Sequence, residues 1–382
     1  MQTHCTPRQF EFQGPGRREI VARFDGGRIT SDGGVVLLGE VDRRRRIVER
    51  FATCFEDSRE PGSVEHTVEE LLRQRLYALA SGYEDLNDHD ELRSDALLAA
   101  VVGKRDPEGR ERKRERDRGA ALAGKSTLHR LEWGVAGQAD EDRYRRIAIS
   151  AEAVDRFFVD VFLDSHASPP DKIVLDLDAT DDPLHGEQEG RFFHGYYGHY
   201  CYLPLYVFCG RHLLCARLRR SNIDAAAGSV EEVDRIVGQI REVWPEVSIL
   251  VRADSGFARE ELMGWCEANG VEFVLGLARN SRLQARLAPA LERAHELGEE
   301  TGKPVRVFAE WQHETLKTWS RKRRVIGKAE ITHKGENPRF IVTSLQGDAR
   351  EIYETIYCAR GDMENRIKEQ QLDLFATRTP GR

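Results

Sequence analysis

The run Ile173-Val174-Leu175-Asp176-Leu177-Asp178-Ala179-Thr180-Asp181-Asp182 carries an apolar, strand-like segment into a turn with four carboxylates. Ionised carboxylates this close raise one another's pKa unless a proton or cation lies between them. A second run, Ser248 to Phe257, has the same order of apolar residues, one acid (Asp254) and a glycine turn. Two such strands bring acids to the carboxyl edge of one sheet, where open α/β folds place their sites. A single strand-end Asp more often caps a helix, but Asp176, Asp178 and Asp254 together favour a site.

Length and composition indicate a large soluble protein. A chain of 382 residues, 40% hydrophobic and 32% charged, predicts two or three globular domains. No apolar stretch approaches the ~20 residues that span a bilayer, and no secretory signal opens the chain, so we expect a cytoplasmic location and no membrane partner. The seven cysteines are scattered and form no CxxC pair, which argues against disulfides and structural zinc.

The net charge of −7 argues against nucleic acid as a partner, but two basic segments oppose it. Residues 317–328 contain no acid, and tryptophans lie alongside, so phosphate contact and base stacking are expected there. The alternative is an edge hairpin kept soluble by its charge. Residues 104–118 interleave arginines with acids, and we interpret them as a solvated linker or exposed helix. The residues expected to contact DNA in the first segment are Lys317, Trp319, Arg321, Lys322, Arg323 and Arg324.

The order of apolar patterns predicts a multidomain α/β fold. Residues 1–168 are expected to be mainly helical, with a boundary near Pro169. From there the patterns read strand, strand, strand, helix, strand, helix, strand, which is the ribonuclease H-like layout with its first and fourth strands central. The predicted strands are 173–177, 196–209, 213–218, 247–251 and 273–277, with helices at 230–244 and 260–269. The catalytic core is then 169–300, a β-rich insertion with a basic hairpin occupies 301–346, and a final helix occupies 347–382.

The final helix carries a polar stripe. Its members recur at steps of three or four residues and therefore share one face. An apolar stripe lines another face, so an ordinary amphipathic helix with an Arg360–Glu364 pair is the alternative interpretation. The polar stripe consists of Tyr357, Arg360, Glu364, Lys368 and Gln371, and the apolar stripe of Ile352, Ile356, Met363, Ile367 and Leu374.

Together these motifs resemble the DDE transposases of bacterial insertion sequences. Asp178-Ala179-Thr180 looks like the first acid of that family, Arg252 to Phe257 like the second, and Tyr357-x2-Arg360-x3-Glu364 like the third. The subgroup with this signature carries a β insertion before the helix, as residues 305–345 do here. The chain departs from the family at Gln371, where the signature has Lys, with Lys368 one turn earlier. It also stops soon after this helix, so a truncated copy is expected.

The resemblance implies metal-dependent DNA strand cleavage and strand transfer at insertion-sequence ends. Asp178, Asp254 and Glu364 would hold two ions, with Asp178 bridging both, and Tyr357, Arg360 and Lys368 would contact DNA. Oxygen ligands without a Cys/His cluster favour Mg²⁺ or Mn²⁺. The family further implies that the N-terminal region recognises terminal inverted repeats, that a homodimer acts on paired ends and target DNA, and that the protein associates with the nucleoid.

Two other functions fit parts of the sequence. Asp176-Leu177-Asp178-Ala179-Thr180 resembles the DxDxT motif of haloacid dehalogenase-like phosphatases, with Asp176 as nucleophile and Asp178 as acid. No convincing downstream Lys or paired acids follow it, and the final helix goes unexplained. The other alternative is a truncated DNA-binding remnant of a transposase without catalysis.

The remaining polar and aromatic side chains of this region are interpreted as structural. Asp181 and Asp182 are expected to be solvated turn residues. Three histidines lack the spacing of a metal site, and four tyrosines are expected to serve strand packing. They are His185, His194 and His199, and Tyr196, Tyr197, Tyr200 and Tyr202.

Overall fold

The computed structural model of the chain describes residues 9–13, 19–23, 30, 32–133, 146–184 and 186–369. Its internal contacts form two compact units, residues 1–150 and 151–382. The boundary therefore lies before the expected one near Pro169, because helix α7 (Ala151–Asp164) packs on a strand and a helix of the second unit. The side chains of Val159 and Phe162 carry α7 into the core of that unit. The multidomain α/β fold is confirmed.

The N-terminal unit is mainly helical, as expected. A capping box between Thr67 and Glu70 starts its central helix, which buries Leu71 and Leu72. Residues 89–102 form two short helices rather than one, because Asp95 caps the second of them by accepting the N–H of Leu98. The helices are α1 (Val35–Arg45), α2 (Ile47–Ala52), α3 (Val68–Ala80), α4 (His89–Leu92), α5 (Ala96–Val102) and α6 (Lys125–Glu132), with 3-10 turns η1 (Pro61–Ser63), η2 (Leu86–Asp88) and η3 (Glu115–Asp117). The strands pair as β1 (Gln9–Gln13) with β2 (Glu19–Arg23) and β3 (Phe55–Asp57) with β4 (Ile147–Ile149).

One mixed sheet organises the second unit. Its strands are β5 (Lys172–Ala179), β9 (Leu205–Cys209), β10 (His212–Arg217), β11 (Ser248–Ala253), β12 (Glu272–Leu277), β13 (Val305–His313), β14 (Arg323–Thr332), β15 (Gly335–Glu336) and β16 (Arg339–Thr343). The order is β10-β9-β5-β11-β12-β16-β14-β13, with β5 parallel to β11. The first and fourth strands of the predicted core are therefore central, as expected. The strands of residues 301–346 extend this same sheet, because β16 pairs with β12.

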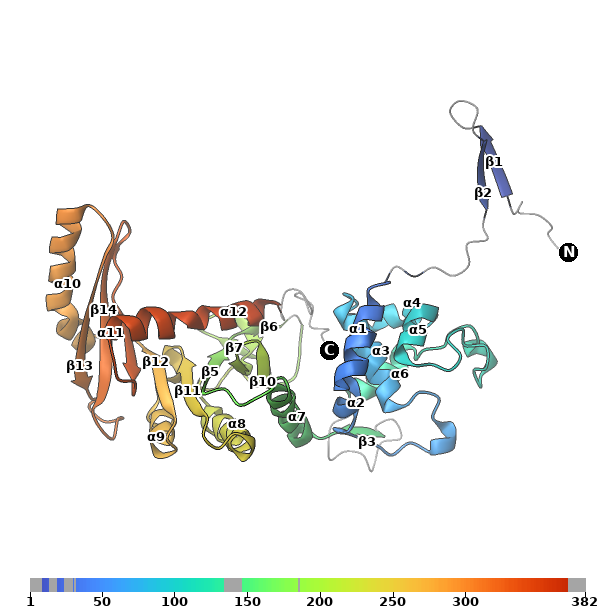
Figure 1. Ribbon diagram of the computed structural model, residues 1–382, viewed down its shortest axis with the longest axis horizontal. Helices are drawn as coiled ribbons and strands as arrows, with labels where there is room; N and C mark the ends of the chain where they lie inside the picture. Colours follow the sequence, from blue (N-terminus) through green and yellow to red (C-terminus); the bar gives the residue numbers. More distant parts are fainter. Residues whose placement is uncertain are drawn as a thin grey trace. The chain divides into compact units, whose positions relative to one another are not determined.

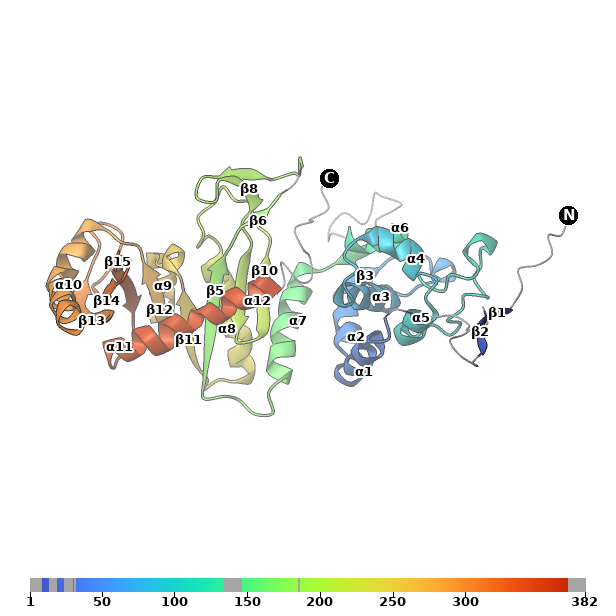
Figure 2. The same cartoon turned by 90° about the horizontal axis from the view of Figure 1, so that it is seen from above.

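Helices cover both faces of the sheet. On one face α7, α8 (Ser229–Val243), α9 (Glu260–Ala268) and α10 (Ser281–Thr301) pack on a continuous apolar core. On the other face lies one C-terminal helical segment, made of α11 (Ala349–Glu351), the π-helical turn η5 (Ile352–Tyr357), the 3-10 turn η6 (Cys358–Arg360) and α12 (Gly361–Lys368). Figure 1 shows α8 and α9 on one side of the strands and this segment on the other, and in Figure 2 the segment crosses over the central strands.

The second predicted strand, residues 196–209, is broken in two. Pro204 lacks the N–H that a continuous ladder needs, and it separates β8 (His199–Tyr202) from β9. β8 instead pairs with β6 (Asp182–Pro183) and β7 (Phe192–His194) in a small separate sheet. Within the described residues, no helix is long and apolar enough to cross a bilayer.

Candidate active site

Asp176 and Asp178 lie on one face of the sheet because side chains alternate along a strand. Leu175 and Leu177 are fully buried in the core beneath α8, which turns Asp176 and Asp178 to the opposite face. β5 and β11 run parallel, and their last paired residues are Leu177 and Ala253. Asp178 and Asp254 each follow one of these, so both acids leave neighbouring strands at the same edge, as the sequence predicts.

Asp176 has a structural partner. Its carboxylate is 5% exposed and accepts from Nε and Nη2 of Arg252 at 2.5 and 2.7 Å. The third guanidinium nitrogen, Nη1, donates to the carbonyl of Ile356 at 2.5 Å. Arg252 thus ties both central strands to the C-terminal helical segment. The phosphatase alternative is wrong on this point, because a nucleophile needs an accessible oxygen and both oxygens of Asp176 are held in a buried ion pair.

The C-terminal helical segment carries the third acid and is less regular than predicted. A π-helical turn, a rare feature that often marks functional sites, is followed at once by a tighter 3-10 turn. Ile352, Met363 and Ile367 are buried against the sheet, as the apolar stripe predicts. Glu364 lies on the exposed side of α12, and Tyr357 and Arg360 precede it in the irregular part.

Arg360 lies between two of the three acids. Its Nη1 is 3.6 Å from Asp178 Oδ1, and its Nη2 donates to Glu364 Oε1 at 2.9 Å. The Nη1 atom is buried and has no hydrogen-bond partner. Burial raises the pKa of Asp178 to about 6, Arg360 opposes the rise, and the negative charges of Asp254 and Glu364 add to it. Asp254 and Glu364 therefore lie near enough to Asp178 to raise its pKa, as expected if the three acids share one site.

Two tyrosines line the acidic edge. The hydroxyl of Tyr357 fills the space beside Gly276 of β12, where an added Cβ would lie 2.6 Å from it. Burial raises the pKa of Tyr357, with Asp254 contributing. Tyr197 donates to the carbonyl of Ala179 at 3.3 Å, and burial, followed by Asp181, Asp178 and Asp254, raises its pKa to about 12. Both hydroxyls therefore stay protonated beside the acids.

Asp254 also caps the turn that follows it. Its Oδ1 accepts the backbone N–H of Gly256 at 2.8 Å. The capping role and the site role coexist, because a carboxylate with one oxygen engaged keeps a second for another ligand.

The donor chemistry of this edge fits a hard divalent cation. Asp178, Asp254 and Glu364 offer only carboxylate oxygens, which Mg²⁺ and Mn²⁺ prefer. Among the described residues, no three His, Cys, Asp or Glu side chains are already grouped as ligands of one ion. Arg360 supplies positive charge between Asp178 and Glu364 instead. The residues therefore fit a divalent ion by donor type and by charge. The side chains of Glu364 and Arg360 must rearrange before the three acids can share one ion.

Comparison with protein families decides the identity of the chain. The profile of one family, described as transposase DDE domain group 1, matches residues 12–382. The chain belongs to this family of DDE transposases. The match covers the whole second unit and nearly all of the first, so DNA transposition is its role and the expected DDE transposase family is confirmed. No curated protein matches the transposase.

The basic segment 317–328 is not the open cationic surface that the sequence suggests. Arg323 is buried, and its guanidinium donates to Glu260 and Glu267 of α9. Arg324 donates to Glu310 and to the carbonyl of Leu345. Trp319 is half-buried against the core, with Arg323 over its ring. The guanidinium groups of Arg323 and Arg324 and the ring face of Trp319 are engaged within the transposase, which argues against the expected DNA contacts of these three residues.

Other expected DNA contacts keep accessible side chains. Lys317, Arg321 and Lys322 are exposed, the last two beside Glu267 and Glu314. Lys368 is exposed at the end of α12. Gln371 and Leu374 of the predicted helix lie outside the described residues, as does His185.

The aromatic region after β5 is the part that sequence reasoning misjudged. Tyr196 is 87% exposed and Tyr200 about half exposed, so neither is simple strand packing. Asp181 accepts from His199 at 2.7 Å and is not a solvated turn residue. Tyr197 lies beside the acids themselves. The sequence offers one sign that these tyrosines lie near the site, which is their position: four tyrosines follow the first acid within one hairpin.

Proposed function

We propose that the transposase cuts DNA at the ends of an insertion sequence and transfers the strand by in-line attack on phosphodiesters. The observation that carries this proposal is the position of Asp178 and Asp254 at one edge of two neighbouring strands, with Arg360 between Asp178 and Glu364. Burial raises the pKa of Asp178, and the negative charges of Asp254 and Glu364 add to the rise. An all-carboxylate cluster whose members repel one another is built for cations. DDE transposases generally use divalent metal ions, and the family implies DNA as the substrate.

Asp178, Asp254 and Glu364 are the residues that would hold a pair of divalent ions. When bound, such a pair activates a water or 3′-hydroxyl and stabilises the leaving oxygen of the phosphodiester. In the chemical step an oxygen of the nucleophile forms a bond to phosphorus as the opposite phosphorus–oxygen bond breaks. Mg²⁺ or Mn²⁺ is the cation class that the oxygen donors favour.

Arg360 and Tyr357 are the proposed positioning groups for DNA. Arg360 lies against Asp178 and Glu364, and its planar guanidinium would donate two hydrogen bonds to a phosphate if bound cations took its place at these acids. The Tyr357 hydroxyl stays protonated near Asp254 and can donate one. Lys368 follows on the exposed end of α12. A dimer acting on paired ends is part of the proposal, since each protomer carries one acid cluster.

The test is cleavage of a labelled duplex that carries the flanking element end, with Mg²⁺ or Mn²⁺. Asp178→Asn, Asp254→Asn and Glu364→Gln are each expected to reduce nicking at least about 100-fold. Asp362→Asn is the matched control, because Asp362 is exposed on the same helix as Glu364 and pairs only loosely with Arg366 at 3.8 Å. Nicking that persists in the three variants would refute the site. Binding of the end without nicking, in either metal, would instead support a non-catalytic remnant.

A further inference from the structure

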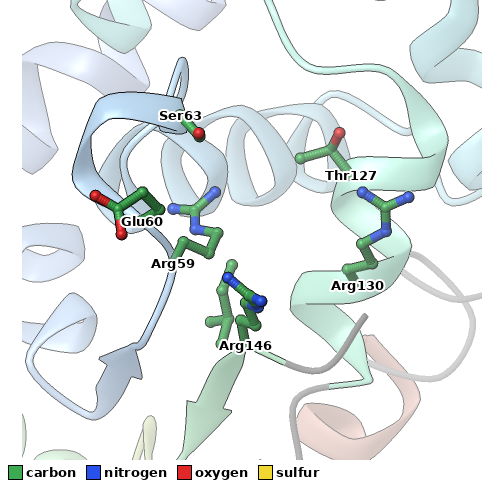
Figure 3. Close-up of a pocket in the computed structure, with 7 residues that line it drawn as sticks. Arg59, Glu60, Ser63, Thr127, Arg130 and Arg146 are labelled. Carbon is green, nitrogen blue, oxygen red and sulfur yellow. The ribbon is translucent and has the colours of Figure 1, made fainter. Parts of the chain in front are cut away.

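The N-terminal unit contains a cleft that the sequence patterns do not reveal. Two neighbouring cavities, of about 480 and 320 Å³, share Arg59, Ser63, Thr127 and Arg130 in their walls. The shared residues place the two cavities side by side, and together they are called the cleft. The loop around η1 forms one wall and the start of α6 the opposite wall, as Figure 3 shows.

The cleft has a strong excess of positive charge. Eight cationic and four acidic side chains line it, an excess of four in a chain whose net charge is −7. The cations are Arg59, Arg93, Arg112, Arg114, Arg116, Lys125, Arg130 and Arg146, and the acids are Glu60, Glu65, Asp90 and Asp117. Low-dielectric walls lined by one sign of charge concentrate the field, so the cleft attracts anions.

Acids hold four of the lining cations in place. Arg93 pairs with Asp117 at 2.8 Å, and Arg112 pairs with Glu65 at 3.2 Å. Lys125 pairs with Asp90 at 2.9 Å, and Arg59 pairs at 2.7 Å with Asp57, which lies outside the cleft lining. The mouth is formed by arginines that are exposed to solvent: Arg114, Arg116, Arg130 and Arg146. In Figure 3 the side chains of Arg59, Arg130 and Arg146 approach the cavity from three different elements.

A buried histidine adds an independent sign of a ligand site. His66 lines the cleft, is 6% exposed, and its Nε2 atom has no hydrogen-bond partner. Burial lowers its pKa to about 3, and Lys104, Arg112 and Arg59 lower it further. A buried polar atom without a partner is costly unless a ligand supplies one. Its surroundings therefore disfavour the charged imidazole, and the Nε2 atom offers a buried hydrogen-bonding position to a ligand in the cleft.

The start of α6 also faces the cleft. Gly124 precedes the helix and provides no side-chain cap, and Gly124, Lys125, Ser126 and Thr127 all line the cavity. The backbone N–H groups of a first helical turn carry partial positive charge and bind phosphate oxygens readily. The hydroxyls of Ser126 and Thr127 can donate further hydrogen bonds there.

We propose that this cleft grips the phosphate backbone of duplex DNA, and thereby holds the element end while the acid cluster of the second unit cuts. The cations span two cavities and several chain segments, a wider footprint than one free phosphate requires. Because the contacts are to phosphates, they position the duplex without reading its sequence. The inference rests on the proposed function in taking DNA as the ligand.

The deciding experiment measures the salt dependence of duplex binding by the full chain, between 50 and 200 mM salt and with divalent metals chelated. The test variant is Arg130→Gln/Arg146→Gln, which changes exposed side chains only. Removing two phosphate contacts is expected to lower the slope of log K against log salt by about 1.8, equally for related and unrelated duplexes. Arg43→Gln/Arg45→Gln on α1, also exposed and outside the cleft, is the matched control and is expected to leave the slope unchanged. Arg116→Gln, a third exposed cation of the mouth, is expected to lower it by about 0.9.

An unchanged slope in the cleft variants would overturn the inference. The inference would also be overturned if the cleft variants no longer bound inorganic phosphate, measured as thermal stabilisation by phosphate, but still bound the duplex. The cleft would then be a small-anion site. These outcomes are separable from failure of the catalytic proposal. Nicking that survives in the Asp178, Asp254 and Glu364 variants removes the proposed active site but leaves the slope to decide the cleft. Cleft variants are expected to recover nicking at low salt, since their acids are intact.

Discussion

The two basic segments of this transposase, residues 317–328 and 104–118, differ in how the fold surrounds their charges. Residues 317–328 contain no acid, yet the structure supplies acids from elsewhere: Glu260 and Glu267 for Arg323, and Glu310 for Arg324. Residues 104–118 alternate acids with bases, yet Arg112, Arg114 and Arg116 line a cleft with a cationic excess. Charge counted along the chain therefore does not show which arginines the fold engages. The field at a surface depends on which partners the fold brings, and the decisive partners here are 14 to 63 residues away.

The largest expected effect distinguishes an engaged arginine from an available one. Arg323→Met leaves Glu260 and Glu267 without their buried partner, so the free energy of unfolding should fall by about 3–5 kcal/mol. The salt slope of DNA binding by the folded protein should not change, because the side chain is 2% exposed. Urea unfolding and duplex titration measure the two quantities. Arg321→Met, 65% exposed, is the control and should cost less than about 0.5 kcal/mol.

A change in the salt slope of folded Arg323→Met would contradict this comparison. It would mean that the ion pairs with α9 open to release the arginine to DNA.

The second prediction concerns the arginine that links the active-site strands to the helical segment. Asp176→Asn leaves Arg252 buried without a counter-charge and should lower the unfolding free energy by about 3 kcal/mol. The double variant Asp176→Leu/Arg252→Met removes both charges and should recover most of this loss. It should still nick poorly, because the hydrogen bond to the Ile356 carbonyl is gone.

Unfolding and metal-dependent nicking of the single and double variants check the idea. Stability and nicking that recover together would show that the pair is only a folding element. Recovery of stability alone would show that it positions Tyr357, Arg360 and Glu364.

Much of the second unit could be predicted from its sequence. Alternation in residues 173–178 places Leu175 and Leu177 in the core and Asp178 on the opposite face, and the strand order follows from short and helical links. The nearness of Glu364 to Asp178 could not be derived from periodicity alone, because it depends on the long-range packing of α12; the resemblance to a known family supplied it. The irregular turns at Tyr357 and Arg360 had no local signal.

The cleft of the first unit lay beyond sequence reasoning for a different reason. Its walls come from segments around residues 59–66, 112–117, 124–130 and 146, each ordinary by itself. Helices α3 and α6 set the distances between them, and those distances depend on the packing of a core that no short motif encodes. The composition shows a net negative charge, so only the resemblance to DDE transposases predicted that this unit binds DNA.

A third prediction uses the buried histidines of the N-terminal unit. Burial lowers the pKa of His66 to about 3 and the pKa of His89 to about 4. In the unfolded chain both histidines have a pKa near 6.5, so just below pH 6.5 they take up protons when the unit is unfolded and stay neutral when it is folded. Stability present above pH 6.5 should therefore be lost as the pH falls from 6.5 toward 4. Each histidine contributes about 1.4 kcal/mol per pH unit in that range. Thermal unfolding between pH 7 and 5 measures it.

The variant His66→Gln/His89→Gln should flatten this pH dependence. Addition of duplex should also reduce it if phosphates enter the cleft, because bound anions weaken the field that disfavours protonated His66. A flat profile in the native protein would show that the two rings are already charged or solvated.

The smallest expected effect returns to segment 317–328. Lys317→Gln/Arg321→Gln/Lys322→Gln changes three exposed side chains, so the unfolding free energy should move by less than about 0.5 kcal/mol. The salt slope should fall by at most about 0.9, the value for one phosphate contact. Arg321 lies 3.4 Å from Glu267 and Lys322 lies 4.0 Å from Glu314, and these acids repel an approaching phosphate while they attract the cations. A fall near 2.7 would mean that all three cations reach phosphates. The segment would then bind DNA at least as strongly as the Arg130 and Arg146 pair. Both basic regions would contact phosphates, and they would differ only in where they lie in the fold.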